Sequence, residues 1–178
     1  MAPKSTSNPP PVGVQATAVA TGSFLTGAMV CLTTVVVPVF LDTDTESIHL
    51  LRHWTRLYHY GHIYMPAVCI GTVGLYGYSV LSKRASKSQE WAIYAVAAAI
   101  TITMVPFTWI FMAPTNNILF DWEKLATAET SVVELNIVQE LVVKWAWLHL
   151  ARSVFPLIGV ILGFKGVLQE RHLQRISG

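Results

Sequence analysis

Hydrophobic residues fill four long stretches of the chain, and charged residues are confined to the gaps between them. No Asp, Glu, Lys or Arg occurs in residues 5–41, 57–82 or 91–120, and residues 145–164 contain one charge, Arg152. A helix crosses a bilayer with about 20 apolar residues. Because the stretches are continuously apolar and do not alternate, the pattern favours helices over a β-barrel.

The pattern predicts an all-α fold, an up-down bundle of four transmembrane helices. The spans are expected at about Ala16–Leu41, Leu57–Leu81, Trp91–Ala113 and Trp145–Phe164. The last helix is predicted to begin earlier, because Ser131 and Glu134 have capping-box spacing and the apolar pattern continues from there to Val167. A helix of that length exceeds the bilayer thickness, so it should be long and project from the membrane.

The two ends of the chain differ from its middle. We expect residues 1–15, which are rich in Pro and Ser, to form a disordered N-terminal tail. Residues 16–172 then form the four-helix membrane domain, and residues 173–178 form a C-terminal tail.

Composition agrees with a membrane protein and excludes several other classes. Of the 178 residues 53% are hydrophobic and 12% are charged, about half the charged fraction of a soluble domain. The net charge of +2 gives no reason to expect nucleic acid as a partner. The chain has no P-loop, GxGxxG, GxSxG or HExxH motif, and Cys31 and Cys69 share no zinc-finger spacing.

The distribution of basic residues predicts the orientation. The connection after the second span and the two chain ends carry seven Lys and Arg against two acidic residues, whereas the other connections carry four basic and eight acidic residues. Because Lys- and Arg-rich loops stay in the cytosol, both termini are expected there. The protein is therefore expected to be a multi-pass protein, integral to an endomembrane such as that of the ER.

Polar side chains inside the spans gather in the half away from the cytosol. Arg152, His149 and Trp145 share one face of the last helix. Because polar groups are costly in lipid, Arg152 indicates a functional site; the alternative is that it snorkels to the surface or pairs with a carbonyl. Further candidates from the second and third spans are His59, His62, Thr108, Asn116 and Asn117.

These candidates predict a polar, aromatic-lined pocket near the non-cytosolic face. For His59 and His62 the alternative is that they are solvated at the membrane edge. For Asn116 and Asn117 it is that they end the helix. Two prolines around Thr108 should loosen the third helix and free backbone carbonyls.

Four segments carry a resemblance to a known family. They are Gly22, Gly27 and Pro38; Tyr60-Gly61 and Pro66; Pro106-Phe107-Thr108 with Met112-Ala113-Pro114-Thr115-Asn116-Asn117; and Trp145-x3-His149-x2-Arg152. From Gly22 to Phe164 the chain resembles the anthrone oxygenases, small four-span membrane proteins of which many are encoded in fungal polyketide gene clusters. The resemblance implies a cofactor-independent monooxygenase that oxidises a polyketide anthrone to an anthraquinone with O2, in secondary-metabolite biosynthesis.

The resemblance and the chemistry of an anthrone together suggest roles for these side chains. The acidic central CH2 needs a general base, for which we take His149, and the resulting oxyanion needs a cation, for which we take Arg152. The nearby positive charge should keep His149 neutral, and His59 would be a second proton carrier. The expected substrate-binding residues are Asn116, Asn117, Trp145, Thr108 and His62.

The expected partners are an aromatic polyketide and membrane lipid, and no metal or other cofactor is expected. Gly71, Gly74 and Gly77, at offsets of three, would admit close helix contact, including contact with a second copy of the chain. Two other functions stay open. One is a metal- or haem-dependent redox protein using His59, His62 and His149; the other is a non-enzymatic carrier or scaffold.

Overall fold

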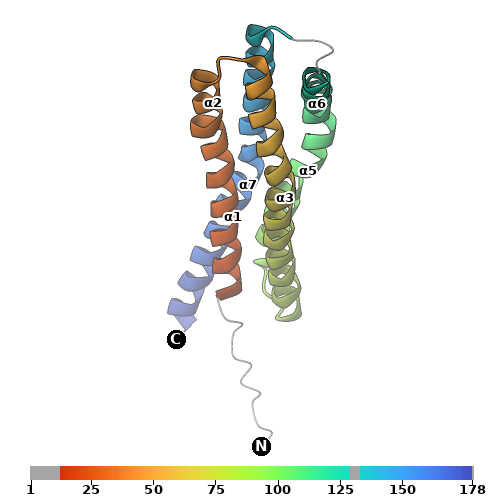
Figure 1. Cartoon of the computed structure of the whole chain (residues 1–178). Helices are drawn as coiled ribbons and strands as arrows, with labels where there is room; N and C mark the ends of the chain where they lie inside the picture. Colours follow the sequence, from red (N-terminus) through yellow and green to blue (C-terminus); the bar gives the residue numbers. More distant parts are fainter. Residues whose placement is uncertain (1–12, 129–132, 178) are drawn as a thin grey trace, which may run out of the picture.

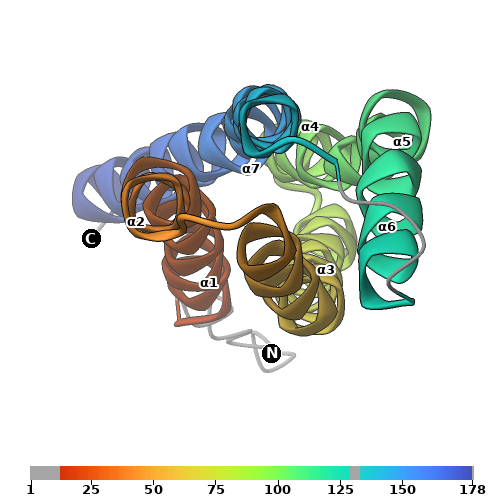
Figure 2. The same ribbon diagram turned by 45° about the horizontal axis from the view of Figure 1, so that its top comes forward.

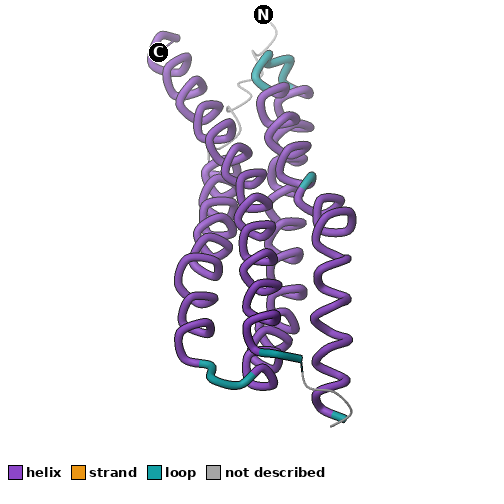
Figure 3. The backbone as a smooth tube through the Cα atoms, turned by 90° about the horizontal axis from the view of Figure 1, so that it is seen from above, coloured by secondary structure: helices purple, strands orange, loops and turns teal. Residues whose placement is uncertain are grey.

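The computed structural model describes residues 13–128 and 133–177, and these residues form helices and short connections without any strand (Figure 3). Residues 1–12 of the expected N-terminal tail and Ser131 of the expected capping box lie outside this range. The first described helix begins at Gly13 and the last ends at Ser177. The division of the chain into two tails and a membrane domain stays a prediction.

The helices group into four long segments. The first segment contains α1 (Gly13–Cys31), a π-helical turn η1 (Leu32–Val36) and α2 (Val37–Thr43), and the second is α3 (Ser47–Ala85). The third contains α4 (Trp91–Ile102), α5 (Met104–Phe107), a π-helical turn η2 (Thr108–Met112) and α6 (Ala113–Thr127), and the fourth is α7 (Leu135–Ser177).

All four segments are long and apolar enough to cross a membrane. Successive segments run in opposite directions, so that the start of α1 and the end of α7 lie at the same end of the molecule (Figure 1). Seen from the other end, the segments surround a common interior (Figure 2). The predicted all-α, four-span, up-down fold is confirmed.

The last helix is long, as predicted, but it is not the only long one. α7 has 43 residues and α3 has 39. α3 begins at Ser47, well before the predicted span at Leu57, and the third segment continues past Ala113 to Thr127. The sequence analysis missed these extensions because it set helix ends where charged residues begin, whereas a helix continues beyond the lipid with charged residues on its exposed faces.

Each π turn ends two residues before a proline. The Val37 N–H donates to the Leu32 carbonyl just before Pro38, and the Ala113 N–H donates to the Thr108 carbonyl just before Pro114. Since proline has no N–H to donate, the helix absorbs it by inserting one residue into the preceding turn. The predicted loosening of the third helix around Thr108 is therefore confirmed.

The end of the bundle away from the α2–α3 connection is closely packed through glycines of α7. The Tyr76 hydroxyl of α3 donates to the Gly159 carbonyl at 3.1 Å. A Cβ added at Gly163 would lie 2.8 Å from Cε1 and 2.9 Å from Cζ of the same ring. Gly163 therefore lets the two helices approach, because no side chain stands between the Tyr76 ring and the α7 backbone.

We expect Gly163→Ala to lower the free energy of unfolding by about 1–3 kcal/mol, because the added methyl group overpacks against buried Tyr76. Gly71→Ala is the matched control, since a Cβ there meets nothing within 4 Å in the described part of the chain. Thermal unfolding of the two variants in the same detergent measures the difference. An unfolding temperature equally high in both would contradict this account of Gly163.

Gly71, Gly74 and Gly77, named in the sequence analysis, do not bring helices of one chain together in this way. Added Cβ atoms at Gly71, Gly74 and Gly77 all lie in open space relative to the described residues. Their use in contact with a second copy stays a prediction.

Candidate functional site

A cavity of about 420 Å³ lies between α3, the third segment and α7, with one contribution from η1. Its volume is within the range of about 300–1,000 Å³ typical of small-molecule sites. Most of the lining is apolar, and two of the lining residues, Ile70 and Trp109, are 63% and 73% exposed. Both residues belong to segments that are long and apolar enough to cross a membrane.

Six of the eight predicted site residues line this cavity: His62, Thr108, Asn116, Trp145, His149 and Arg152. The other two, His59 and Asn117, do not. His59 lies in a separate shallow groove with Arg52 and Glu123, and Asn117 is exposed. Of each of these two pairs of candidates, one residue lines the cavity (His62, Asn116) and the other does not (His59, Asn117).

Arg152 turns into the bundle, where its guanidinium group contacts the π turn of the third segment. Its Nη1 donates to the Thr108 hydroxyl at 2.9 Å, and that hydroxyl donates to the Met104 carbonyl at 2.8 Å. Thr108 therefore holds the guanidinium group against the cavity wall. Such a cation in a low-dielectric pocket favours an anionic oxygen in its vicinity.

His149 is fully buried, with 2% of its surface exposed, and lies one turn before Arg152 on α7. Its Nδ1 lies 3.1 Å from the Thr33 hydroxyl of η1. Trp145 lies beside it on the same helix face, with ring centroids 4.8 Å apart. The predicted face of α7 therefore carries an indole, an imidazole and a guanidinium group along one wall of the cavity.

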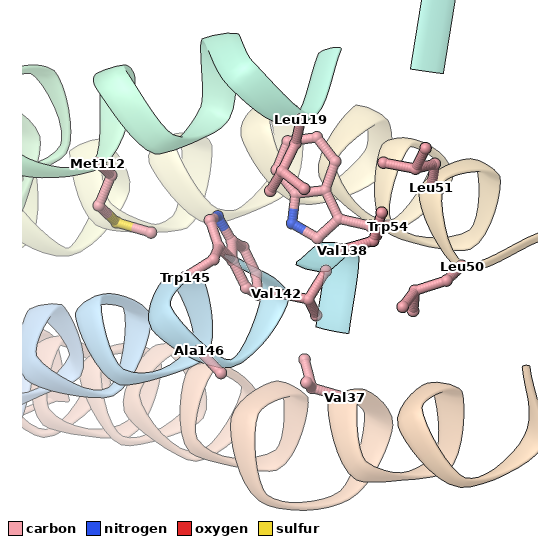
Figure 4. Close-up of a cluster of buried hydrophobic side chains, with 10 residues drawn as sticks. All are labelled: Val37, Leu50, Leu51, Trp54, Met112, Leu119, Val138, Val142, Trp145 and Ala146. Carbon is pink, nitrogen blue, oxygen red and sulfur yellow. The ribbon is translucent and has the colours of Figure 1, made fainter. Parts of the chain in front are cut away.

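Aromatic rings close the end of the cavity near Trp145. Trp145 projects from α7 between Met112 and Trp54 (Figure 4), and the two indole rings meet edge to face at 5.9 Å. Tyr58 stacks on His62 with ring centroids 5.4 Å apart and an interplanar angle of 13°. The packed rings of Trp145, Tyr58 and His62 give the cavity wall aromatic faces against which a planar aromatic ligand can stack.

Three buried polar atoms of cavity-lining residues have no hydrogen-bond partner among the described residues: Asn116 Oδ1, Trp145 Nε1 and Arg152 Nε. Asn116 Oδ1 is an acceptor, and the indole and guanidinium N–H groups are donors. Because an unpaired buried polar atom is costly, such a set points to a ligand that offers both a hydroxyl group and acceptor oxygens.

The three histidines of the metal alternative are not brought together. His59 and His62 are neighbours, with ring centroids 5.8 Å apart, but His59 does not line the cavity that His149 lines. Within residues 13–128 and 133–177, no group of three or more His, Cys, Asp or Glu side chains could hold a metal ion. The donor set therefore gives this alternative no support.

Thr33 and Tyr58 are two residues of the site that the sequence analysis did not predict. Thr33 contacts His149 across 116 positions of the chain, and nothing in the local sequence signals that contact. Tyr58 lines the cavity, and its position four residues before His62 on the same helix was an available signal.

The chain is similar in sequence to known proteins. A sequence model described as anthrone oxygenase matches residues 54–162. An anthrone oxygenase of Aspergillus novofumigatus is 55% identical over 157 residues, covering 88% of this chain and 94% of that protein. Anthrone oxygenases of a Cryptosporiopsis species and of Claviceps purpurea are 49% and 38% identical, covering 96% and 88% of this chain and 98% and 90% of their own lengths. No solved structure matches the chain.

Proposed function

The chain belongs to the anthrone oxygenase family, and from this premise we propose that it oxidises a polyketide-derived anthrone to an anthraquinone with O2 in the cavity between α3, the third segment and α7. No metal or other cofactor takes part in the proposed reaction. The enzyme works in an endomembrane with both termini in the cytosol. Protease protection of a tag attached after Gly178, in sealed microsomes, tests that orientation.

The observation that carries the proposal is the set of three unpaired polar atoms next to a buried histidine. An anthrone formed from a polyketide presents a ring carbonyl flanked by phenolic hydroxyl groups. Arg152 Nε and Trp145 Nε1 donate hydrogen bonds to the carbonyl oxygen, and Asn116 Oδ1 accepts a hydrogen bond from a phenolic hydroxyl group. A planar, apolar substrate also reaches the cavity directly from the lipid past Ile70 and Trp109, which line the cavity and are exposed.

The reaction begins with removal of a proton from the central CH2 by His149. The carbanion is delocalised onto the carbonyl oxygen as an aromatic phenolate, and Arg152 stabilises that negative charge. The anion is oxidised by O2 as a C–O bond forms at the same carbon, and the peroxide oxygen takes up the proton from His149. Loss of the second C–H proton and cleavage of the O–O bond give the new carbonyl and water. Both oxygen atoms and all electrons are accounted for by the anthrone and O2, so no external reductant is needed.

The direct test incubates membranes containing the protein with an anthrone that carries phenolic hydroxyl groups beside its carbonyl, under O2, and measures the anthraquinone formed. Because anthrones also oxidise slowly on their own, membranes without the protein give the background rate. The rate with the native protein is expected to exceed it. Binding of the anthrone without any gain in rate would instead favour the carrier alternative.

Asn116 and Asn117 offer a matched pair of variants for this assay. We expect Asn116→Leu to raise KM about tenfold or more, because the substrate hydroxyl loses its buried acceptor. Asn117→Leu should have little effect, since Asn117 is exposed and does not line the cavity. Equal KM values for the two variants would contradict the proposed binding mode.

A further inference from the structure

We infer that Thr33 is a positioning residue that fixes the tautomer of His149, so that Nδ1 carries the proton and Nε2 presents a lone pair to the cavity. This inference rests on the proposed function for its chemical meaning. The contact itself is independent of that function. His149 Nδ1 lies 3.1 Å from Thr33 Oγ1, and Thr33 Oγ1 lies 3.3 Å from the Met29 carbonyl oxygen.

The direction of the hydrogen bonds follows from the number of protons available. A threonine hydroxyl has one proton to donate and lone pairs to accept with, whereas a carbonyl only accepts. If the Thr33 proton goes to the Met29 carbonyl, Nδ1 of His149 must donate to Thr33 Oγ1. The Thr33 hydroxyl does lie on the Met29 carbonyl, in the usual hydrogen bond of a helical threonine to the carbonyl four residues earlier, so Nδ1 is left as the donor of the other contact.

The opposite arrangement would disable the proposed base. If Thr33 donated to Nδ1, the Met29 carbonyl would lose the Thr33 proton and Nε2 would carry the ring proton. A nitrogen that already carries a proton cannot take one from the substrate CH2. Since a free imidazole samples both tautomers, a base at this position needs a partner that selects one of them.

The fold explains why Thr33, and not its neighbour, makes this contact. Thr33 and Thr34 both lie in the π turn η1, and the hydroxyl of each donates to a carbonyl four residues earlier in the chain. Thr33 is half-buried and faces α7, whereas Thr34 is exposed. The chain therefore supplies a matched control at the adjacent position, with the same side chain and the same local hydrogen bond.

The test that does not depend on activity is 15N NMR of protein labelled at histidine and held in detergent micelles, with the His149 signals identified by their absence in His149→Gln. The native protein and Thr34→Val should show a protonated Nδ1 and an unprotonated Nε2. Thr33→Ser keeps the hydroxyl and should give the same signals. Thr33→Val removes it and should shift both nitrogens toward a mixture of tautomers. A native His149 protonated at Nε2, or native signals in Thr33→Val, would overturn the inference.

The kinetic test uses the same variants with the anthrone. Thr33→Val should lower kcat by roughly 10–100-fold with little change in KM, as expected when the group that orients a reacting imidazole is lost. Thr33→Ser should restore most of the rate, and Thr34→Val should keep it. If native protein shows the expected tautomer but does not oxidise the anthrone, the proposed function fails and the positioning role stands. If it oxidises the anthrone and Thr33→Val is equally fast, the positioning role fails.

Discussion

Glutamine in place of His149 is expected to lower kcat by about 10²–10⁴-fold and to leave KM nearly unchanged. The amide fills a similar volume in the wall of the cavity, but it cannot take the proton from the substrate CH2. Because His149 is buried against Thr33 and Trp145, no bulk water can replace it as the base. Anaerobic binding of the anthrone, followed by mixing with O2, separates substrate binding from the chemical step.

His59→Gln is the control for this prediction. His59 is exposed and does not line the cavity, so its replacement should leave kcat close to the native value. Adding Arg152→Met to His149→Gln should slow the reaction little further, because a base and an oxyanion donor that act on the same step are strongly non-additive. A His149→Gln protein as fast as the native one, or a His59→Gln protein as slow as His149→Gln, would contradict the assignment of the base.

The fold was predictable because the lipid imposes a simple condition on the sequence. Stretches of about 20 residues or more with almost no charge are expected to cross as helices, and the four segments of this chain are helices long and apolar enough to do so. The true helix ends were less predictable. The segment from Ser47 to Leu57 carries charges and histidines, and it is helical because Leu50, Leu51 and Trp54 pack into the interior between exposed polar residues.

The site was predictable only where its residues share one helix. The offsets of three and four on α7 placed Trp145, His149 and Arg152 on one face. Contacts between helices depend on relative rotation, which a single sequence does not encode locally. This is why the sequence could not separate Asn116 from Asn117, or signal the contact of Thr33 with His149.

The pairing of charged residues near the ends of helices was not predictable from the sequence either. The sequence analysis placed Lys83 and Glu170 outside the spans and gave no sign that the two residues pair. In the structure they form a buried ion pair, with Lys83 Nζ 2.7 Å from Glu170 Oε2. The other carboxylate oxygen, Oε1, accepts from the Tyr94 hydroxyl at 2.8 Å. α3 and α7 run in the same direction (Figure 1), so that Lys83 near the end of α3 and Glu170 of α7 lie at the same end of the bundle.

Breaking this ion pair from one side should be the most destabilising change outside the cavity. Lys83→Met leaves a buried carboxylate with only the Tyr94 hydroxyl to stabilise it, and Glu170→Gln leaves a buried ammonium group without its counter-ion. We expect each to lower the free energy of unfolding by about 3–5 kcal/mol. Denaturant unfolding in detergent measures this loss.

The double variant decides whether the loss comes from the charges. Lys83→Met combined with Glu170→Gln leaves no uncompensated charge and keeps an acceptor for Tyr94, so it should be more stable than either single variant. Lys165→Met, at an exposed position on α7, should change stability by less than about 0.5 kcal/mol. If the two single losses simply added in the double variant, the ion pair would contribute nothing as a pair. The ends of α3 and α7 would then be held together by packing around Tyr76 and Tyr94 alone.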